Sequence, residues 1–359
     1  MKKRFFPRFF YSLPYTEEDL QAAAKNAGET LDFPEDFISA ETRRKIEENR
    51  LELLAQQQYI YAHPKHIIIN RLSWILLLFV VGSLGIILFN LENEPLVQYR
   101  KHLIMLSFVV FTGSRVFATK SRSLIKDFVK QKVAKKNSWL YDPKLSYEKA
   151  DALNTQFPHV FFRGDQSISV EDEFYGVQNV ESKSYYFNSG LYTYKIKKRR
   201  RKGITRYKTI RNHYICIKLV KPLSVEFLLK PEIAGGIFNV FNSKEIDLES
   251  DEFNKLFSFS YTGKKEENSA EIVKNLSPAV QLGLIDLAKR RPSFRFFFSK
   301  NTLVFLFRGE LVPSSFIGLS TLKTKSYNYS GVKNEDVERI ENEIKNITDL
   351  AVSITKYLD

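Results

Sequence analysis

The densest set of chemically active side chains is a run of positive charge between residues 195 and 211. The run holds ten Lys or Arg residues and no Asp or Glu, and Tyr192, Tyr194 and Tyr207 lie within it or beside it. Cations among aromatic rings suit an anionic lipid surface, and they equally suit single-stranded nucleic acid whose bases stack on the rings. The residues expected to make such contacts are Lys195, Lys197, Lys198, Arg199, Arg200, Arg201, Lys202, Arg206, Lys208 and Arg211.

Outside this run the charge is concentrated in one other place. The formal net charge is +14, and the run supplies ten of these charges. The stretch from Lys120 to Lys136 adds a net +6, so the rest of the chain sums to −2. The positive charge is therefore local. The plainest alternative for the 195–211 run is a solvated turn that is kept soluble by its charge.

Other residue combinations give little support for catalysis. The sequence has no phosphate-binding loop, no dinucleotide-binding glycine pattern, no zinc-protease motif and no nucleophile elbow. We interpret Glu171-Asp172-Glu173 as a solvated turn, because successive strand residues face opposite sides and make a poor acid/base pair. Asp165, which follows Gly164, is interpreted as an Asx-turn cap. We therefore predict no catalytic residue and no cofactor.

Histidine and cysteine do not predict a metal or nucleophile site. His63 and His66 are separated by Pro64 and have no third ligand nearby in sequence, so we expect polar residues at a membrane entry and no bound metal. The single cysteine, Cys216, excludes an intrachain disulfide framework. Along an extended strand His213 faces away from Cys216, which favours an ordinary strand cysteine.

Two apolar stretches upstream of the basic run predict a transmembrane helical hairpin. The residues from about 72 to 89 include no charge over 18 positions, and as a helix they span about 27 Å. A second stretch covers about 102 to 119, where Arg115 lies near the helix end. A short polar connection with Pro95 favours two antiparallel spans. The alternative is a pair of buried helices in a soluble core.

The charges beside these spans predict their orientation. Nine Lys or Arg residues lie at the outer ends of the two spans, whereas the connection has only Arg100 and Lys101. Positive flanks stay on the cytoplasmic side, so we expect a multi-pass protein of the plasma or inner membrane with both termini cytoplasmic. Pro7 and Arg8 interrupt the apolar start of the chain, which argues against a cleaved signal peptide.

These features divide the chain into three parts. Residues 1–65 are expected to form a short helical cytoplasmic region, with one charged helix over 40–61. Residues 66–120 hold the membrane hairpin, and residues 121–359 are expected to form a cytoplasmic mixed α+β domain. The whole fold class is therefore α+β, with a two-helix transmembrane hairpin before the domain.

Within the domain, aromatic and β-branched runs predict strands, and capping residues predict helices. An amphipathic juxtamembrane helix is expected over 124–136, and a helix is expected to start at Ser277-Pro278. A C-terminal helix over 334–358 has an apolar seam that either docks on the domain's own sheet, which we favour, or pairs as a coiled coil. Strands are expected over 159–162, 223–229, 294–299 and 302–307, together with a β-hairpin over 184–220 whose tip is 199–203.

The order of these features resembles a bacterial domain-of-unknown-function family, number 3137, over roughly residues 140 to 359. The matching motifs are Arg163-Gly164-Asp165, the strands that flank the basic run, Asp251-Glu252-Phe253 with Phe257, and Leu276-Ser277-Pro278-Ala279. The resemblance implies a two-span membrane protein with a C-terminal α+β domain. It implies no catalytic residue, because the family is uncharacterised.

The expected function is a membrane-anchored, non-catalytic interaction, scaffolding or sensing module at the cytoplasmic face. Its basic hairpin would contact anionic lipid headgroups, and an unidentified protein partner would bind elsewhere. Two alternatives remain open. One is an enzyme of unrecognised type in the C-terminal domain, and the other is a membrane-tethered RNA-binding protein.

Overall fold

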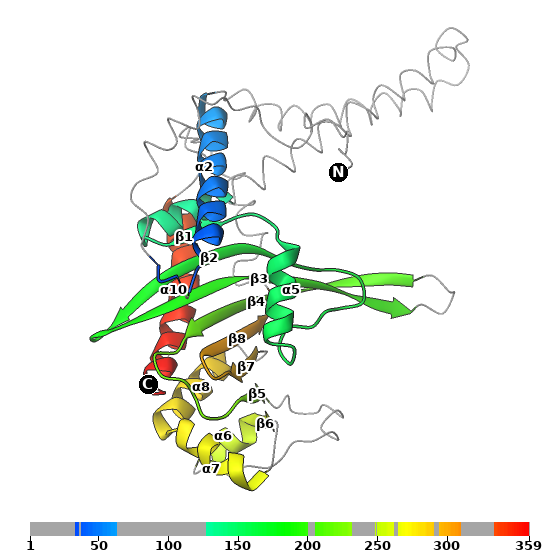
Figure 1. Cartoon of the computed structure of the whole chain (residues 1–359), viewed down its shortest axis with the longest axis vertical. Coiled ribbons are helices and arrows are strands. Elements are labelled where there is room, and N and C mark those ends of the chain that lie inside the picture. The colour runs from blue at the N-terminus through cyan, green and yellow to red at the C-terminus, as the bar shows by residue number, and fades with distance from the viewer. Residues whose placement is uncertain are drawn as a thin grey trace, which may run out of the picture. The chain divides into compact units, whose positions relative to one another are not determined.

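The computed structural model describes residues 33–35, 37–62, 127–199, 205–231, 248, 250–261, 265–290, 294–309 and 334–358. They form a mixed α+β structure around an eight-stranded antiparallel sheet with the strand order β1-β2-β3-β4-β8-β7-β5-β6 (Figure 1). The predicted α+β class is confirmed. Within these ranges no helix is both long enough and apolar enough to cross a membrane. The predicted spans, 72–89 and 102–119, lie outside the described residues.

The sheet belongs to a compact unit that draws on separate parts of the chain. The described residues of Glu29–Arg50, Lys130–Phe316 and Glu335–Asp359 fall in this unit, which we call the sheet unit. Its strands are β1 (Leu140–Asp142), β2 (Ile168–Val180), β3 (Lys183–Arg199), β4 (Thr205–Lys218), β5 (Phe227–Pro231), β6 (Phe257–Tyr261), β7 (Phe294–Phe298) and β8 (Thr302–Arg308).

The predicted basic hairpin is present as β3 and β4. These strands pair antiparallel from Phe187 opposite Ile217 to Arg199 opposite Thr205. The positions of the expected tip beyond Arg199 lie outside the described residues. In Figure 1 the ends of both strands extend past the neighbouring strands of the sheet. β2 pairs with β3 only as far as Tyr194, so five residues of β3 project beyond it, about 17 Å at strand spacing.

Helices cover both faces of the sheet. Helix α5 (Tyr147–Gln156) packs on one face, which we call the α5 face. Its buried side chains include Tyr192, Tyr214 and Cys216. In Figure 1, α10 (Asn334–Lys356) crosses the opposite face. Aromatic rings from neighbouring strands pack edge to face there, as Phe296 and Phe305 do with centroids 4.0 Å apart.

The remaining helices follow the capping signals of the sequence. Helix α2 (Ala40–Ala62) starts after Ser39, whose hydroxyl accepts the Thr42 N–H at 3.3 Å. Residues 127–136 are helical, in agreement with the predicted juxtamembrane helix. The others are α6 (Asp251–Leu256), α7 (Lys265–Asn275) and α8 (Pro278–Arg290), and the last begins at the predicted Ser277-Pro278 signal.

Two predicted strands differ from the structure. Residues 158–161 form a turn, in which Val160 and Phe161 are buried beneath α5 as an apolar plug. The 223–229 run becomes extended only at Phe227. In both cases apolar residues are buried without pairing in the sheet, and burial alone does not distinguish a strand from a packed turn.

The C-terminal helix docks within the same chain. Six apolar residues along the predicted seam are buried in the single chain, so the apolar side of α10 faces the sheet unit. Helix α8 leaves room for this contact at Gly283, where an added Cβ would lie 2.9 Å from Ile354. Burial of this seam favours docking over a coiled-coil dimer. The buried residues are Val337, Ile340, Ile344, Ile347, Ala351 and Ile354.

We expect Ile344→Ala to lower the free energy of unfolding by about 2 to 5 kcal/mol, because it leaves a cavity under α10. Chemical unfolding of the full chain at several protein concentrations measures this cost. The cost should not change with concentration, and Asn342→Ala on the exposed side of α10 should leave stability unchanged. A melting temperature that rises with protein concentration would instead indicate a dimer.

Candidate functional site

A bulge in β2 separates the acidic run Glu171-Asp172-Glu173 into two contacts, of which the one made by Glu173 is buried. The pairing of β2 with β3 shifts between Glu171 and Phe174, so two residues lie opposite Gly190 alone. Asp172 has a φ of +60°, the left-handed conformation that a bulge of this kind requires. The predicted solvated turn is wrong, because the bulge keeps this segment in the sheet and buries Glu173.

The bulge directs the two carboxylates to opposite faces. Asp172 accepts a 2.7 Å hydrogen bond from the Tyr141 hydroxyl and forms an ion pair with Lys130. Glu173 points to the α5 face, where its side chain is 2% exposed. The two carboxylates therefore have separate sets of partners.

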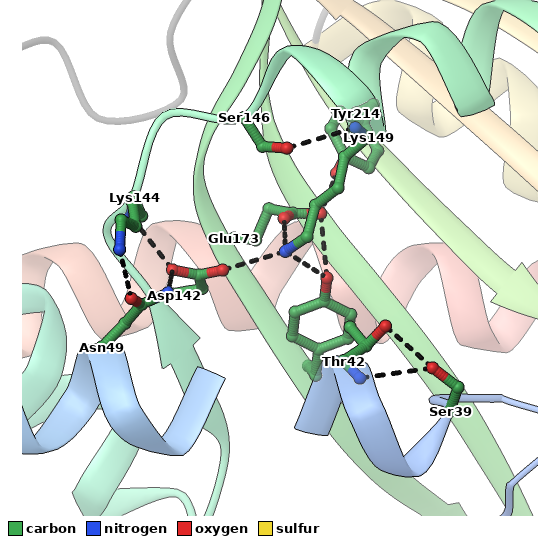
Figure 2. Close-up of polar contacts among 10 residues, drawn as sticks. Ser39, Thr42, Asn49, Asp142, Lys144, Ser146, Lys149, Glu173 and Tyr214 are labelled. Atoms are coloured by element: carbon green, nitrogen blue, oxygen red, sulfur yellow. Dashed lines mark hydrogen bonds and ion pairs between the residues drawn. The ribbon is translucent and has the colours of Figure 1, made fainter. Parts of the chain in front are cut away.

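Glu173 belongs to a buried polar network around the ammonium group of Lys149 (Figure 2). Lys149, from α5, forms an ion pair with Glu173 and a second one with Asp142 at 2.9 Å. The hydroxyls of Tyr175 and Tyr214 donate to Glu173 Oε1 at 3.1 and 2.7 Å. We call these five residues the Lys149 network.

Asp142 extends the network to the beginning of the chain. Its Oδ1 accepts hydrogen bonds at 3.0 Å from the Asn49 side chain and from the Lys144 backbone N–H. Lys144 in turn donates to the Asn49 side-chain oxygen at 2.9 Å. Figure 2 shows α2, β1, α5 and the sheet meeting at this point. The contact joins Asn49 of α2 to strand β1 within the sheet unit.

The space for Glu173 depends on the absence of a side chain at Gly190. A Cβ at this position would lie 2.9 Å from the Tyr214 hydroxyl and 3.0 Å from Glu173 Cγ. Contacts this close force a neighbour to move, and both neighbours are fixed by hydrogen bonds. Gly190 is therefore required by close packing, since its backbone does not have a positive φ.

The pKa values of Lys149, Tyr175 and Tyr214 are all raised above their ordinary values. Burial raises the pKa of both Tyr175 and Tyr214 well above the ordinary value, and the charge of Glu173 adds to this. Burial works against the ammonium of Lys149, but Tyr175, Glu173 and Asp142 outweigh it and raise its pKa. Both tyrosines stay neutral hydrogen-bond donors at physiological pH, and Lys149 stays charged.

The network has the chemistry of a structural lock. All four carboxylate oxygens of Asp142 and Glu173 already accept hydrogen bonds from protein groups. A general base needs a free oxygen within reach of its substrate, and these oxygens are committed. Sequence reasoning missed Lys149 and Asp142 because the residues of the network are far apart in the chain.

The predicted separation of His213 from Cys216 is confirmed. The His213 Nε2 lies 2.7 Å from the Ser189 hydroxyl on the face opposite α5, and Ser189 is fully buried. The Cys216 thiol lies on the α5 face, where burial, with a smaller effect of Glu173, raises its pKa. A thiol of this kind is a poor nucleophile at neutral pH.

Metal binding has no support in the described ranges. No three His, Cys, Asp or Glu side chains there are arranged to hold a metal ion. His63 and His66, which we predicted to be polar residues at a membrane entry, lie outside the described residues.

A cleft of about 690 Å³ opens on the α5 face beside the Lys149 network. Tyr175 belongs to both, and Cys216 contributes to the lining of the cleft. The cleft is lined by apolar side chains from α5 and the N-terminal segment, and by polar side chains from β3 and the start of β8. The lining includes Phe37, Leu153, Phe157, Asn188, Asn301 and Thr302.

The structure distributes the predicted basic residues over both faces of the β3–β4 ribbon. Strand pairing places Lys198 opposite Arg206 and Lys197 opposite Tyr207, and all four are exposed. Alternation along the strands puts Lys198, Arg206 and Lys208 on the α5 face, and Lys195, Lys197 and Arg211 on the other. Arg199 ends β3, while Arg200, Arg201 and Lys202 lie outside the described residues.

Gly164 and Asp165 fasten the base of this ribbon. The Asp165 N–H donates to the Lys195 carbonyl at 2.8 Å, and its carboxylate accepts the Lys197 N–H at 2.5 Å. Gly164 has a φ of +69°, and a Cβ there would lie 2.8 Å from the Lys195 carbonyl oxygen. The Asx-turn interpretation of Asp165 is wrong, because the free edge of β3 beyond β2 provides a donor that the carboxylate binds.

The other motifs behind the family resemblance also serve the fold. Ser250 caps α6 by accepting the Phe253 N–H at 3.2 Å, and Phe253 is fully buried. Leu276 is buried just before α8 starts at Pro278. Comparison with protein-family models, curated proteins and solved structures finds no match for this chain. The resemblance therefore stays a prediction.

Removal of the Lys149 charge should lower stability by about 3 to 5 kcal/mol, because Lys149→Met leaves two buried carboxylates without a cation. Thermal unfolding measures the loss, and Lys274→Met, at an exposed lysine of α7, is the control. The double variant Lys149→Met/Glu173→Gln should recover part of the loss. An unchanged melting temperature in Lys149→Met would contradict the structural role.

The raised pKa values predict a loss of stability in alkaline solution. Above about pH 10 the unfolded chain releases protons from tyrosine and lysine that the native network retains, so unfolding becomes more favourable as pH rises. Melting temperatures between neutral pH and pH 11 measure the slope. Tyr214→Phe should make it shallower, whereas Tyr147→Phe, at an exposed tyrosine, should not change it.

Proposed function

We propose that this protein is a membrane-anchored, non-catalytic interaction module whose basic hairpin contacts anionic lipid headgroups. The observation that carries the proposal is the packing of chain segments from either side of the predicted membrane hairpin. Phe33, Ile38 and Ile46 come before it, and they form one buried cluster with Leu140 and Tyr175, which come after it.

This packing supports an even number of membrane crossings. The chain leaves the sheet unit at Arg50 and re-enters it at Lys130. An even number of crossings would return the chain to the side from which it left. Asn49 and Asp142 reinforce the connection with a hydrogen bond of 3.0 Å. The arrangement agrees with the two predicted spans and with the nine-to-two distribution of flanking charges, which favours the cytoplasmic side of the plasma or inner membrane.

The anchor would keep the basic ribbon close to the inner leaflet. Each cation near an anionic membrane surface contributes about 1 kcal/mol to membrane binding. The attraction falls off with distance from the surface over a Debye length, which is about 8 Å at physiological salt. The exposed Tyr207 on the ribbon suits the headgroup region. Both faces of the ribbon carry cations, so the ribbon can contact headgroups edge-on or flat.

The described residues give less support to an enzyme than to an RNA-binding protein. An enzyme needs accessible catalytic groups, but the carboxylates of the Lys149 network are saturated and the Ser189–His213 pair is enclosed. RNA binding would use the same exposed cations and Tyr207. Proximity to the membrane favours lipid. A protein partner would bind at a surface other than the ribbon.

The proposed topology predicts the labelling of two introduced thiols. Glu48→Cys and Lys274→Cys place thiols at exposed positions before and after the predicted spans, and the native Cys216 is buried. A membrane-impermeant maleimide should label both only after intact cells are opened. Labelling of either thiol from outside would overturn the proposed orientation.

If the ribbon contacts lipid, a fluorophore on the ribbon should enter a less polar environment when an anionic membrane is present. A fluorophore attached to Tyr207→Cys should shift to the blue when the full chain is placed in lipid nanodiscs that contain phosphatidylglycerol, but not in phosphatidylcholine alone. Charge reversal of Lys197, Lys198 and Arg206 to Glu should abolish the shift, because these cations are exposed and make the electrostatic contact.

A matched variant controls for total charge. Lys255, Lys274 and Lys300 are also exposed, and their reversal to Glu should leave the shift intact. Failure of the chain to enter nanodiscs, or an equal shift in the ribbon variant, would contradict the proposal. Salt-sensitive RNA retention that the ribbon variant abolishes, without any lipid response, would establish the RNA-binding alternative.

A further inference from the structure

Two cations lie side by side on the α5 face at the end of the sheet away from β1. Strands β5 and β7 pair with Leu228 opposite Phe297 and Leu229 opposite Phe296. Continuation of this register places Lys230 directly opposite Arg295, and both side chains are half-buried. Like charges in this relation repel and destabilise a sheet.

No acidic neighbour offsets this repulsion within the described residues. Burial lowers the pKa of Lys230 and the charge of Arg295 lowers it further, while no carboxylate raises it. Burial likewise lowers the pKa of Arg295, and only Tyr194 opposes the effect. Half-buried cations normally have a counterion, and no carboxylate among the described residues acts on either cation of this pair.

The surroundings fix the guanidinium in place. The Arg295 guanidinium lies 4.8 Å from the centroid of the Phe162 ring, and Phe162 is held in turn by a 2.7 Å hydrogen bond from the Tyr192 hydroxyl to its carbonyl oxygen. A stacked guanidinium keeps its planar edge free for two parallel hydrogen bonds. Ser258 lies opposite Lys230 on β6, and its hydroxyl donates to the Lys230 backbone carbonyl oxygen at 3.4 Å.

We propose that Lys230 and Arg295 bind a phosphate group on the α5 face, between β5 and β7. A forked guanidinium beside a compact ammonium matches a tetrahedral oxyanion, and the Phe162 ring lies over the guanidinium. The phosphate belongs to a lipid headgroup or to a free phosphate ester. Arg308, on the neighbouring part of β8, is also exposed on this face and attracts either ligand.

Only the headgroup source rests on the proposed membrane function, since a free phosphate needs no bilayer. The test therefore begins with inorganic phosphate, titrated into the full chain in neutral detergent at constant ionic strength and followed by calorimetry. Lys230→Gln and Arg295→Gln should each weaken binding about tenfold or more. Lys274→Gln, which removes one exposed charge, should bind like the parent.

The same variants report whether a loss of binding reflects damage to the fold. Lys230→Gln removes a repulsion, so its melting temperature without phosphate should equal or exceed that of the parent. Arg295→Lys keeps the charge but loses the planar fork, and it should also bind phosphate more weakly. Absence of phosphate binding by the parent, or parent-like binding by both Gln variants, would overturn the proposal.

Nanodiscs distinguish the two sources of phosphate. If a headgroup occupies the site, phosphatidic acid in the disc will weaken the binding of inorganic phosphate to the parent. If the ligand is a free ester, phosphatidic acid will have no effect, and phenyl phosphate will compete. The charge-reversed ribbon variant should still bind inorganic phosphate, so failure of the lipid-contact proposal and failure of this one give different results.

Discussion

Lys149 carries a positive charge into the interior of the domain, and Asp142 and Glu173 surround its ammonium group. Two buried carboxylates near one lysine are stable only while every oxygen and every proton has a partner. The bulge in β2 points Glu173 inward, Gly190 leaves space for it, and Tyr214 donates to it. Strands β1, β2 and β4 and helix α5 are therefore joined by one set of hydrogen bonds, for which β3 leaves space at Gly190.

The same interaction joins parts of the chain that are distant in sequence. Asn49 donates to Asp142 across 93 positions, and the apolar contacts of Phe33 and Ile38 with the sheet lie on the same side. The chain between these partners holds the predicted membrane hairpin. Both ends of that segment adjoin residues of the sheet unit.

The sequence predicted the elements whose signals are local. The β3–β4 hairpin, the start of α8 at Pro278 and the seam of α10 follow from strand composition, capping and helical spacing. Glu173 was assigned to a solvated turn because its burial depends on Lys149 and Gly190, which no local pattern connects. Asp165 was misassigned for a related reason, since its partner is the backbone of Lys197, 32 residues away. The cationic pair Lys230 and Arg295 becomes visible only once the register of β5 and β7 is known.

The ribbon of β3 and β4 is continuous with the strands that form the core. Tyr192 and Tyr214 are buried in the same strands that carry the exposed Lys198 and Arg206. No joint interrupts the described part of the ribbon, and Asp165 braces its outer edge. A rigid arm of this kind converts contact at its end into a fixed angle of the whole sheet. The basic residues would then set the tilt of the domain against the surface that they touch, in addition to holding it there.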